Sequence, residues 1–359
     1  MKELFVDLDK KTYKIYFDVT FENLCKKISD VGNYKKVLIV TDSNVEKLYL
    51  DEVKEQLLKG GFDVSAISFE AGEQNKHMDT ILSICKACIK HSMDRKSLIV
   101  ALGGGVVGDM AGFAASIFMR GIDFIQVPTT LLSQSDSSVG GKTGIDFMGA
   151  KNILGAFHQP KLVYINTSTL KTLPKREFIS GMGEVIKHGM IRNKEFFNYL
   201  ADNFDEISKV DDKTMLDVVY TNCKIKADVV SKDEFENGVR ADLNFGHTIG
   251  HAIESYMDFS LSHGECVGLG MLACCFISVL KNKLTNCELE SLKNVLGLYG
   301  FRVKIPIADK NAIKELMKKD KKKANDKQKF ILAEKIGFVY QSMDVTEEEI
   351  DKAIEYICE

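Results

Sequence analysis

The sequence predicts an α/β protein of two domains: an N-terminal Rossmann-like domain with a parallel sheet and a mostly α-helical C-terminal domain. Between residues 36 and 166, short β-branched runs alternate with segments of helical periodicity, which is typical of a doubly wound parallel sheet. From residue 175 to about 299 the helical periodicity is nearly continuous. The chain has 359 residues, enough for two ordinary domains. We therefore expect domains at 1–174 and 175–359, with the active site in the interdomain cleft.

Five apolar runs are predicted to form the strands of the sheet, at residues 36–41, 62–69, 97–102, 123–128 and 161–166. The third run is apolar throughout, as parallel strands buried on both faces tend to be. Residues 45–60 and 78–91 have the apolar periodicity of helices. Near the C-terminus, residues 330–333 and 338–340 are expected to form a small hairpin or an edge strand.

Composition and charge exclude several classes of function. Apolar residues make up 45% and charged residues 28% of the chain, the balance of a soluble globular protein. The net charge of -3 gives no basic field, so we expect no nucleic-acid partner. The first residues lack the apolar core of a signal peptide, and the longest uncharged run, 266–280, is too short to span a bilayer. We therefore expect a cytoplasmic protein without a membrane partner.

The nine cysteines are scattered and odd in number, which favours reduced thiols over a disulfide framework. Cys85 and Cys88 have the spacing of a redox or metal-binding pair. They lie in an amphipathic helical pattern, however, and the sequence has no second pair of this kind. We therefore interpret both as ordinary helix residues.

A glycine-rich turn, Gly103-Gly-Gly-Val-Val-Gly108, follows the third predicted strand and precedes a run of small residues. The order of strand, glycine turn and helix lets backbone N–H groups meet a pyrophosphate. Tight turns between strands and helices also need glycine without any ligand, so the motif alone is weak. Asp42 and Asn44 follow an earlier strand, where a carboxylate could accept hydrogen bonds from ribose hydroxyls. Together these features favour a dinucleotide site.

Residues 128–146 form a second unusual stretch, rich in glycine, serine and threonine. It also carries Asp136 and Lys142, and Lys151-Asn152 follows shortly after. A purely structural loop would not need this density of hydrogen-bond donors. We therefore favour a site for a polyanionic small molecule here.

Three of the seven histidines lie in a short window, at His247, His251 and His263. The first two are four residues apart, which places both imidazoles on one face of a helix. Imidazole and carboxylate groups are ligands for Zn²⁺, so a metal site is the first hypothesis. A histidine pair at this spacing also arises by chance. A zinc peptidase is disfavoured because Thr248 stands where such an enzyme has glutamate.

Six motifs in one order along nearly the whole chain resemble the dehydroquinate synthase family, at 103–112, 128–146, 151–160, 181–187, 243–254 and 263–265. The resemblance implies a lyase of the shikimate pathway of aromatic amino acid biosynthesis. It would convert a phosphorylated keto acid, 3-deoxy-D-arabino-heptulosonate 7-phosphate, into 3-dehydroquinate and phosphate. It also implies catalytic use of NAD and a divalent metal, with Zn²⁺ expected first and Co²⁺ as the alternative.

The resemblance also implies roles for individual residues. The metal ligands would be Glu184, His247 and His263, which makes His251 a substrate-binding or proton-relay residue. His188, a rival ligand by its spacing from Glu184, would then be structural or a neighbour of the ligands. Substrate-binding positions would be Asp136, Lys142, Asn152, Lys187, Lys226, Arg240, Asn244 and His251.

Further implied positions concern the phosphate and the cofactor. Arg120 matches a family arginine that reaches the phosphate across a homodimer interface. One of Lys321 and Lys322 would also contact the phosphate, and we choose Lys322. The NAD-binding positions would be Asp42, Asn44, Glu73, Lys76, Gly104, Gly105, Val106, Asp109, Thr129, Thr130, Lys142, Lys151, Thr169, Leu170, Lys171 and Thr172. The sequence departs from the family at Ser135, where an apolar residue is usual, and at Gly183, where alanine is common.

Three alternatives remain open at this stage. Another sugar-phosphate cyclase would share fold, metal and cofactor, but Lys226, Arg240 and Asn244 favour a substrate with a carboxylate. A metal-dependent NAD polyol dehydrogenase would not need the stretch from Asp136 to Lys142. A non-enzymatic NAD-sensing module would leave the implied metal ligands unexplained.

Overall fold

The chain forms two compact units in a computed structural model, which describes residues 1–258, 260–319 and 328–359. The first unit comprises Met1–Leu173 and Met215–Glu234, and the second comprises Pro174–Thr214 and Phe235–Glu359. The division expected at residue 174 differs from this arrangement, because most of helix α8 (Asp212–Lys232) belongs to the first unit. The rings of Tyr220 and Phe17 meet edge to face at 5.2 Å, and Asn222 donates to the carbonyl of Ser135 at 2.6 Å.

A seven-stranded sheet organises the first unit, in the order β1-β2-β9-β6-β5-β3-β4. Every neighbouring pair is parallel except β1 with β2. All five predicted strands are present, and β1 and β2 are added to them. The strands are β1 (Lys2–Val6), β2 (Tyr13–Asp18), β3 (Lys36–Asp42), β4 (Asp63–Phe69), β5 (Leu98–Gly103), β6 (Asp123–Pro128) and β9 (Leu162–Asn166).

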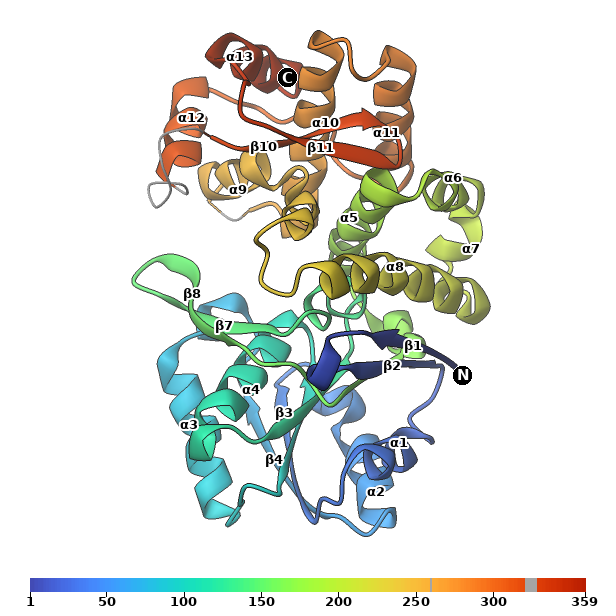
Figure 1. The fold of residues 1–359 in the computed structure, drawn as a ribbon, viewed down its shortest axis with the longest axis vertical. Helices are drawn as coiled ribbons and strands as arrows, with labels where there is room; N and C mark the ends of the chain where they lie inside the picture. The colour runs from blue at the N-terminus through green and yellow to red at the C-terminus, as the bar shows by residue number, and fades with distance from the viewer. Residues whose placement is uncertain (259, 320–327) are drawn as a thin grey trace. The chain divides into compact units, whose positions relative to one another are not determined.

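Helices cover both faces of this sheet, as Figure 1 shows. Because successive strand residues point to opposite faces, Val37 and Ile39 pack with α1 (Leu24–Val31) and α2 (Asp51–Lys59). Leu38 and Val40 pack on the other side with α3 (Met78–Lys90) and α4 (Gly105–Ile117). The predicted Rossmann-like α/β class is confirmed for this unit. Cys85 and Cys88 lie on α3 as free thiols, and burial raises the pKa of Cys88 to about 12.

The segments that follow the strands complete the first unit. The polar stretch after β6 is not simply a loop, because it contains a helical turn and the first strand of a hairpin. These elements are η5 (Ser133–Ser137), β7 (Lys142–Phe147) and β8 (Ala150–Phe157), and η6 (Thr167–Thr172) follows β9. The antiparallel β7 and β8 lie over α4.

The second unit is mostly helical, as predicted. Its helices are α5 (Lys175–Arg192), α6 (Lys194–Asp202), α7 (Phe204–Ser208), α9 (His247–Tyr256), α10 (His263–Leu280), α11 (Asn286–Leu298), α12 (Lys310–Lys319) and α13 (Glu347–Tyr356). The expected hairpin is present as β10 (Phe330–Lys335) and β11 (Phe338–Ser342). By length and composition α10 could cross a membrane, but 72% of it is buried inside the protein, and it packs against α5, α9, α11 and α13. It is the core helix of this unit.

Candidate active-site residues

One edge of the sheet collects most of the predicted cofactor residues. Strands β9, β6, β5 and β3 are parallel neighbours, so their carboxyl ends meet at the same edge. Asp42 ends β3, Gly103 ends β5, and the η6 turn follows β9. The order in which strands are added to the sheet reverses between β3 and β5, since β4 lies outside β3 and β6 lies on the other side, beyond β5. Ligands bind at such switch points in doubly wound sheets.

The glycine turn packs closely against neighbouring side chains. Gly104 is the N-cap of α4 and Gly105 its first residue. A Cβ atom on Gly104 would lie 3.1 Å from the Thr130 methyl, and one on Gly105 would lie 3.1 Å from Ser137 Oγ. Side chains at these two positions would press against Thr130 and Ser137, so glycine keeps both segments close to the start of the helix. The turn lies between the carboxyl end of β5 and the N-terminus of α4, which is the position that binds a pyrophosphate in such sheets, and Val106 continues the first turn of the helix.

A buried glutamine holds the threonine segments beside this turn. Gln134 Nε2 donates to the carbonyls of Pro128 at 3.2 Å and Asn166 at 3.0 Å, and to Thr169 Oγ1 at 3.0 Å. It thereby ties the end of β6, which leads to Thr129 and Thr130, to the η6 turn with Leu170, Lys171 and Thr172. Gln134 was not among the residues predicted from the sequence. Its place inside the polar stretch 128–146 was the available signal.

Asp42 is already engaged with its own turn. Its Oδ1 accepts from the backbone N–H groups of Asn44 at 2.9 Å and Val45 at 3.0 Å. This Asx-type turn fixes the chain as it leaves β3. The predicted ribose contact would therefore fall to the second carboxylate oxygen.

Lys76 joins predicted cofactor and substrate residues from three elements. Its buried Nζ donates to Asp109 Oδ2 at 2.7 Å and to Asn152 Oδ1 at 2.5 Å, and lies 3.8 Å from Glu73. Burial lowers the pKa of Lys76, but the charges of Asp109 and Glu73 outweigh it and the net shift is upward. Burial raises the pKa of Asp109 despite its lysine partner. Four of the predicted residues thus form one network.

Lys226 on α8 contacts Asp136 on η5. The lysine Nζ donates to the backbone carbonyl and to Oδ1 of Asp136, both at 2.6 Å. Two predicted substrate residues are therefore brought together in the first unit. Lys142 on β7, Lys151 on β8 and Arg120 after α4 are exposed, and Arg120 has a left-handed φ of 70°.

The second unit gathers the predicted metal ligands from three helices. Glu184 lies on α5, while His247 and His263 are the first residues of α9 and α10. Glu184 Oε1 is 3.6 Å from the Nε2 atom of each histidine. This oxygen is buried and has no hydrogen-bond partner among the described residues, whereas Oε2 pairs with Lys187.

This arrangement fits a divalent cation. A buried carboxylate oxygen without a partner is costly, and a cation between it and the two imidazoles would compensate it. Ligand distances of about 2.0–2.2 Å are reached when a metal lies between atoms spaced this way. His251 remains a geometric rival, because ligand atoms of His247, His251 and His263 all lie within 4.8 Å of one another. The unpartnered Glu184 oxygen favours Glu184. His188 is buried on the same helix.

The protonation of the three groups follows from their surroundings. Burial raises the pKa of Glu184, but Lys187 and the two histidines outweigh it and hold the pKa well below its usual range. Burial, together with the Lys187 charge, lowers the pKa of His247 well below its usual value. Burial also lowers the pKa of His263, but Glu184 and Glu254 outweigh it and raise the pKa to about 9. Without a metal, Glu184 is therefore ionised and His247 neutral.

Glycines allow the ligand-bearing helices to touch through their backbones. A Cβ atom on Gly264 would lie 2.0 Å from the Ser180 carbonyl oxygen, and one on Gly183 would lie 2.8 Å from the Gly264 carbonyl oxygen. A Cβ atom on Gly270 would lie 1.9 Å from the carbonyl oxygen of Gly246, which has a left-handed φ of 79°. Gly183, which stands where the family commonly has alanine, therefore lies at a backbone contact between α5 and α10.

The predicted substrate residues Arg240 and Asn244 lie on η7 (Val239–Asn244), directly before α9. Arg240 is buried, and Asn244 donates to Glu236 Oε1 at 2.6 Å. Asp242, between them, accepts from Arg192 at 2.5 Å and from Gln341 at 3.2 Å. Asp242, Arg192 and Gln341 were not predicted from the sequence, because their pairing joins α5, η7 and β11.

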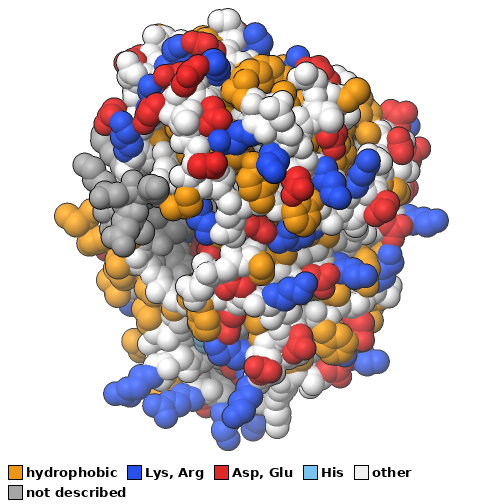
Figure 2. Space-filling model, turned by 45° about the horizontal axis from the view of Figure 1, so that its top comes forward, with side chains coloured by type: hydrophobic (Ala, Val, Ile, Leu, Met, Phe, Trp, Pro, Cys, Tyr) orange, Lys and Arg blue, Asp and Glu red, His pale blue; other side chains and the backbone are white. Residues whose placement is uncertain are grey.

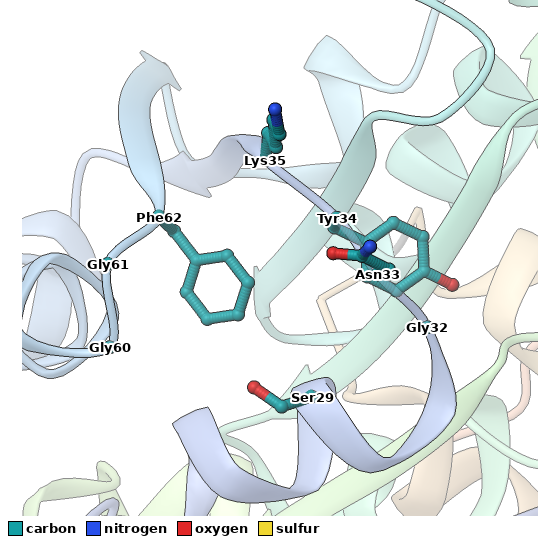
Figure 3. A pocket seen from close by; sticks show the side chains of 8 residues that line it. All are labelled: Ser29, Gly32, Asn33, Tyr34, Lys35, Gly60, Gly61 and Phe62. Carbon is teal, nitrogen blue, oxygen red and sulfur yellow. The ribbon is translucent and has the colours of Figure 1, made fainter.

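Two features lie outside this group of residues. Lys321 and Lys322 fall outside the described residues. A hollow of about 400 Å³ lies in the first unit where the chain enters β3 and β4, shown in Figure 3. This is the amino edge of the sheet, opposite the glycine turn, and no predicted site residue lines it. It is lined by Ser29, Gly32, Asn33, Tyr34, Lys35, Gly60, Gly61 and Phe62.

Solved structures with the same architecture define the class of protein. A 2-deoxy-scyllo-inosose synthase complexed with carbaglucose-6-phosphate, NAD⁺ and Co²⁺ matches with a TM-score of 0.90 and 25% identity, covering 98% of this chain and 99% of that one. A 2-epi-5-epi-valiolone synthase from Streptomyces hygroscopicus with NAD⁺ and Zn²⁺ matches with a TM-score of 0.89 and 25% identity, covering 98% of both chains. The fold is that of the sugar-phosphate cyclases.

The family follows from the sequence comparisons. The family model for the 3-dehydroquinate synthase N-terminal region matches residues 66–180, and the model for its C-terminal region matches residues 181–323. The 3-dehydroquinate synthase of Acetivibrio thermocellus is 44% identical over 355 residues, which cover 99% of each chain. The chain belongs to the 3-dehydroquinate synthase family.

Proposed function

We propose that the chain converts 3-deoxy-D-arabino-heptulosonate 7-phosphate into 3-dehydroquinate and phosphate. Family membership supports the reaction, since relatives named for it match both units of the chain. The structural observation that carries the proposal is the buried Glu184 oxygen without a hydrogen bond, which faces the Nε2 atoms of His247 and His263.

The cofactors are NAD and a divalent metal, Zn²⁺ or Co²⁺. Glu184, His247 and His263 would hold the metal, and the glycine turn with the η6 segment would hold NAD. When bound, the metal acidifies and orients neighbouring hydroxyl groups, and NAD accepts a hydride that it later returns. The cyclase structures that hold NAD⁺ with Co²⁺ or Zn²⁺ support this pair of cofactors.

The protein supplies fixed cations for a substrate that carries a carboxylate and a phosphate. Lys187, Lys226 and Arg240 are all buried, so their charges act in a low dielectric and pair strongly with an anion. Asn244 and Asn152 add amide groups that orient hydroxyls. His251, whose ring centroid lies 5.2 Å from that of His247, binds the substrate or relays a proton through its imidazole. Holding the chain in one conformation assists the final intramolecular ring closure.

Arg120 completes the phosphate site in a second copy of the chain. It follows Met119, which is 44% exposed and has a left-handed φ of 50°. Exposed apolar residues occur on this segment and on the β7–β8 hairpin, where Met148 is 90% exposed. Apolar side chains in such numbers favour burial against a partner subunit. The expected assembly is a homodimer.

The surface charge bears on the partners and the cellular compartment of the enzyme. Figure 2 shows acidic and basic side chains interspersed on one face, which agrees with the net charge of -3. A net charge of -3 gives no basic field that would attract nucleic acid or an anionic membrane. We place the enzyme in the cytoplasm.

Turnover with trace NAD⁺ tests the reaction. Phosphate release should exceed the NAD⁺ supplied many times, without accumulation of NADH, because the hydride returns to the product. A polyol dehydrogenase would instead consume NAD⁺ in proportion to product. Phosphate release from sedoheptulose 7-phosphate or glucose 6-phosphate, but not from the keto acid, would assign a different cyclase.

Metal retention tests the ligand set separately. His263→Ala should purify without stoichiometric metal, because the two remaining protein ligands, Glu184 and His247, hold a cation only weakly. Metal analysis by mass spectrometry gives the result directly. Stoichiometric metal in this variant would show that His263 is not a ligand.

A further inference from the structure

Both ring nitrogens of His263 face a carboxylate. Nε2 lies 3.6 Å from Glu184 Oε1, and Nδ1 lies 3.7 Å from Glu254 Oε2 on the other side of the ring. The Glu254 side chain is only 10% exposed. His263 is thus placed between the proposed ligand Glu184 and a second buried carboxylate that has no assigned role.

The two proposed histidine ligands have different supports. His247 Nδ1 lies 3.2 Å from the backbone carbonyl oxygen of Phe245, a neutral acceptor that its own chain segment provides. His263 starts α10, and its Nδ1 faces a charged group from α9 instead. Since α9 also carries His247, one helix supplies a ligand and the partner of another ligand. His247 and Glu254 are seven residues apart, two turns along one face.

A neutral imidazole binds a metal through its unprotonated nitrogen and carries its proton on the other ring nitrogen. A carboxylate beside Nδ1 favours the tautomer with the proton on that atom, so that Nε2 keeps its lone pair toward Glu184. The carboxylate also restrains ring rotation and makes the imidazole a stronger donor. A short rotation of the ring or of the carboxylate would bring the 3.7 Å pair to hydrogen-bond distance.

We propose that Glu254 is a positioning residue for the metal site and acts through His263. The proposal rests on the ligand set given under the proposed function. Removing such a partner weakens metal binding about 10- to 100-fold in comparable sites. Glu254 would therefore set metal affinity without touching the metal.

The test is the Zn²⁺ affinity of the full-length protein, measured by competition with a chromophoric chelator. Glu254→Gln should bind Zn²⁺ about 10- to 100-fold more weakly, and Glu254→Asp, which keeps the charge, should recover part of the loss. Glu288→Gln is the matched control, because it removes a carboxylate from a capping box elsewhere in the same unit and should leave the affinity unchanged. Wild-type affinity in Glu254→Gln would overturn the proposal.

A second measurement covers the case in which Glu254→Gln does not fold. In wild-type protein with ¹⁵N-labelled histidine, Zn²⁺-loaded His263 should show a protonated Nδ1 and a metal-shifted Nε2. A bare Nδ1 would overturn the inference. If His263→Ala keeps its metal, the ligand set itself fails. If His263→Ala loses metal while Glu254→Gln binds normally, the ligand set stands and only the role of Glu254 is lost.

Discussion

The two units use different kinds of chemical group at the sites proposed for their cofactors. In the first unit the positions that would meet the pyrophosphate are glycines, threonines and backbone groups at the carboxyl edge of a sheet, and Gln134 joins these segments. The charged cofactor positions of that unit, such as Lys76 and Asp109, pair with each other. In the second unit the metal positions are ionisable side chains on three helices, of which Glu184 is buried and His247 and His263 are partly buried. A neutral site loses one hydrogen bond when a residue changes. A site of buried charges is destabilised more strongly when one partner is removed, because the remaining charge stays desolvated and unpaired.

The largest effect should come from Glu184→Gln. The amide cannot replace the carboxylate as a metal ligand, and Lys187 loses its ion-pair partner. We expect loss of stoichiometric metal and a fall in kcat/KM of about 10³-fold or more. Metal analysis and steady-state assays measure both. A variant that keeps metal and activity would show that the second unit tolerates change as well as the first.

Gly264→Ala should damage the same site without changing a ligand. The new methyl would meet the Ser180 carbonyl at 2.0 Å and push α10 away from α5. We expect a loss of about 3 kcal/mol in the free energy of unfolding and weaker metal binding. Gly297→Ala is the matched control, since nothing lies within 4 Å of its Cβ position on α11. It should raise stability by about 0.5 kcal/mol, and equal effects of the two changes would refute the steric argument.

Gly105→Ala probes the first unit. The methyl would occupy the space between the start of α4 and Ser137 Oγ, where a pyrophosphate would approach the backbone. We expect the KM for NAD⁺ to rise about 10- to 100-fold, while metal content stays stoichiometric. Loss of metal together with NAD affinity would show that the two sites do not respond independently to substitution.

Asp242→Asn should have the smallest effect. It weakens the contact with Arg192 that steadies η7, and that contact is partly exposed. A loss of about 1.4 kcal/mol would raise the substrate KM about 10-fold. Metal affinity should not change, because His247 and His263 do not contact Asp242 in the described contacts. An unchanged KM would mean that η7 holds Arg240 and Asn244 without this pair.

The fold was largely predictable because its elements have strong periodic signals. The apolar run that became β5 and the helical pattern of 175–299 left little ambiguity. Strands β1 and β2 were not predicted, because exposed residues such as Phe5 break the alternation expected of a strand. The place of α8 in the first unit could not be predicted either. It depends on contacts between residues far apart in sequence, such as Asn222 with Ser135.

The candidate site was predictable where a motif carries the chemistry. The composition and spacing of His247, His251 and His263 indicated a metal site. Spacing alone did not show whether Glu184 or His251 is the third ligand. That choice needed the resemblance, and the unpartnered Glu184 oxygen now supports it. Supporting residues such as Gln134, Asp242 and Glu254 carry no motif, since each acts through a residue on another segment.

The glycines between α5, α9 and α10 have a consequence for metal choice. Where main chains touch, there is no flexible layer of side chains to take up a displacement, so the helices behave as a single rigid frame. An ion of different radius must then be accommodated by rotation of the ligand side chains, the Glu184 carboxylate and the two imidazole rings. Selectivity among divalent ions would accordingly be set by small angular adjustments within a fixed scaffold, and exchange of Zn²⁺ for Co²⁺ should leave the backbone unchanged.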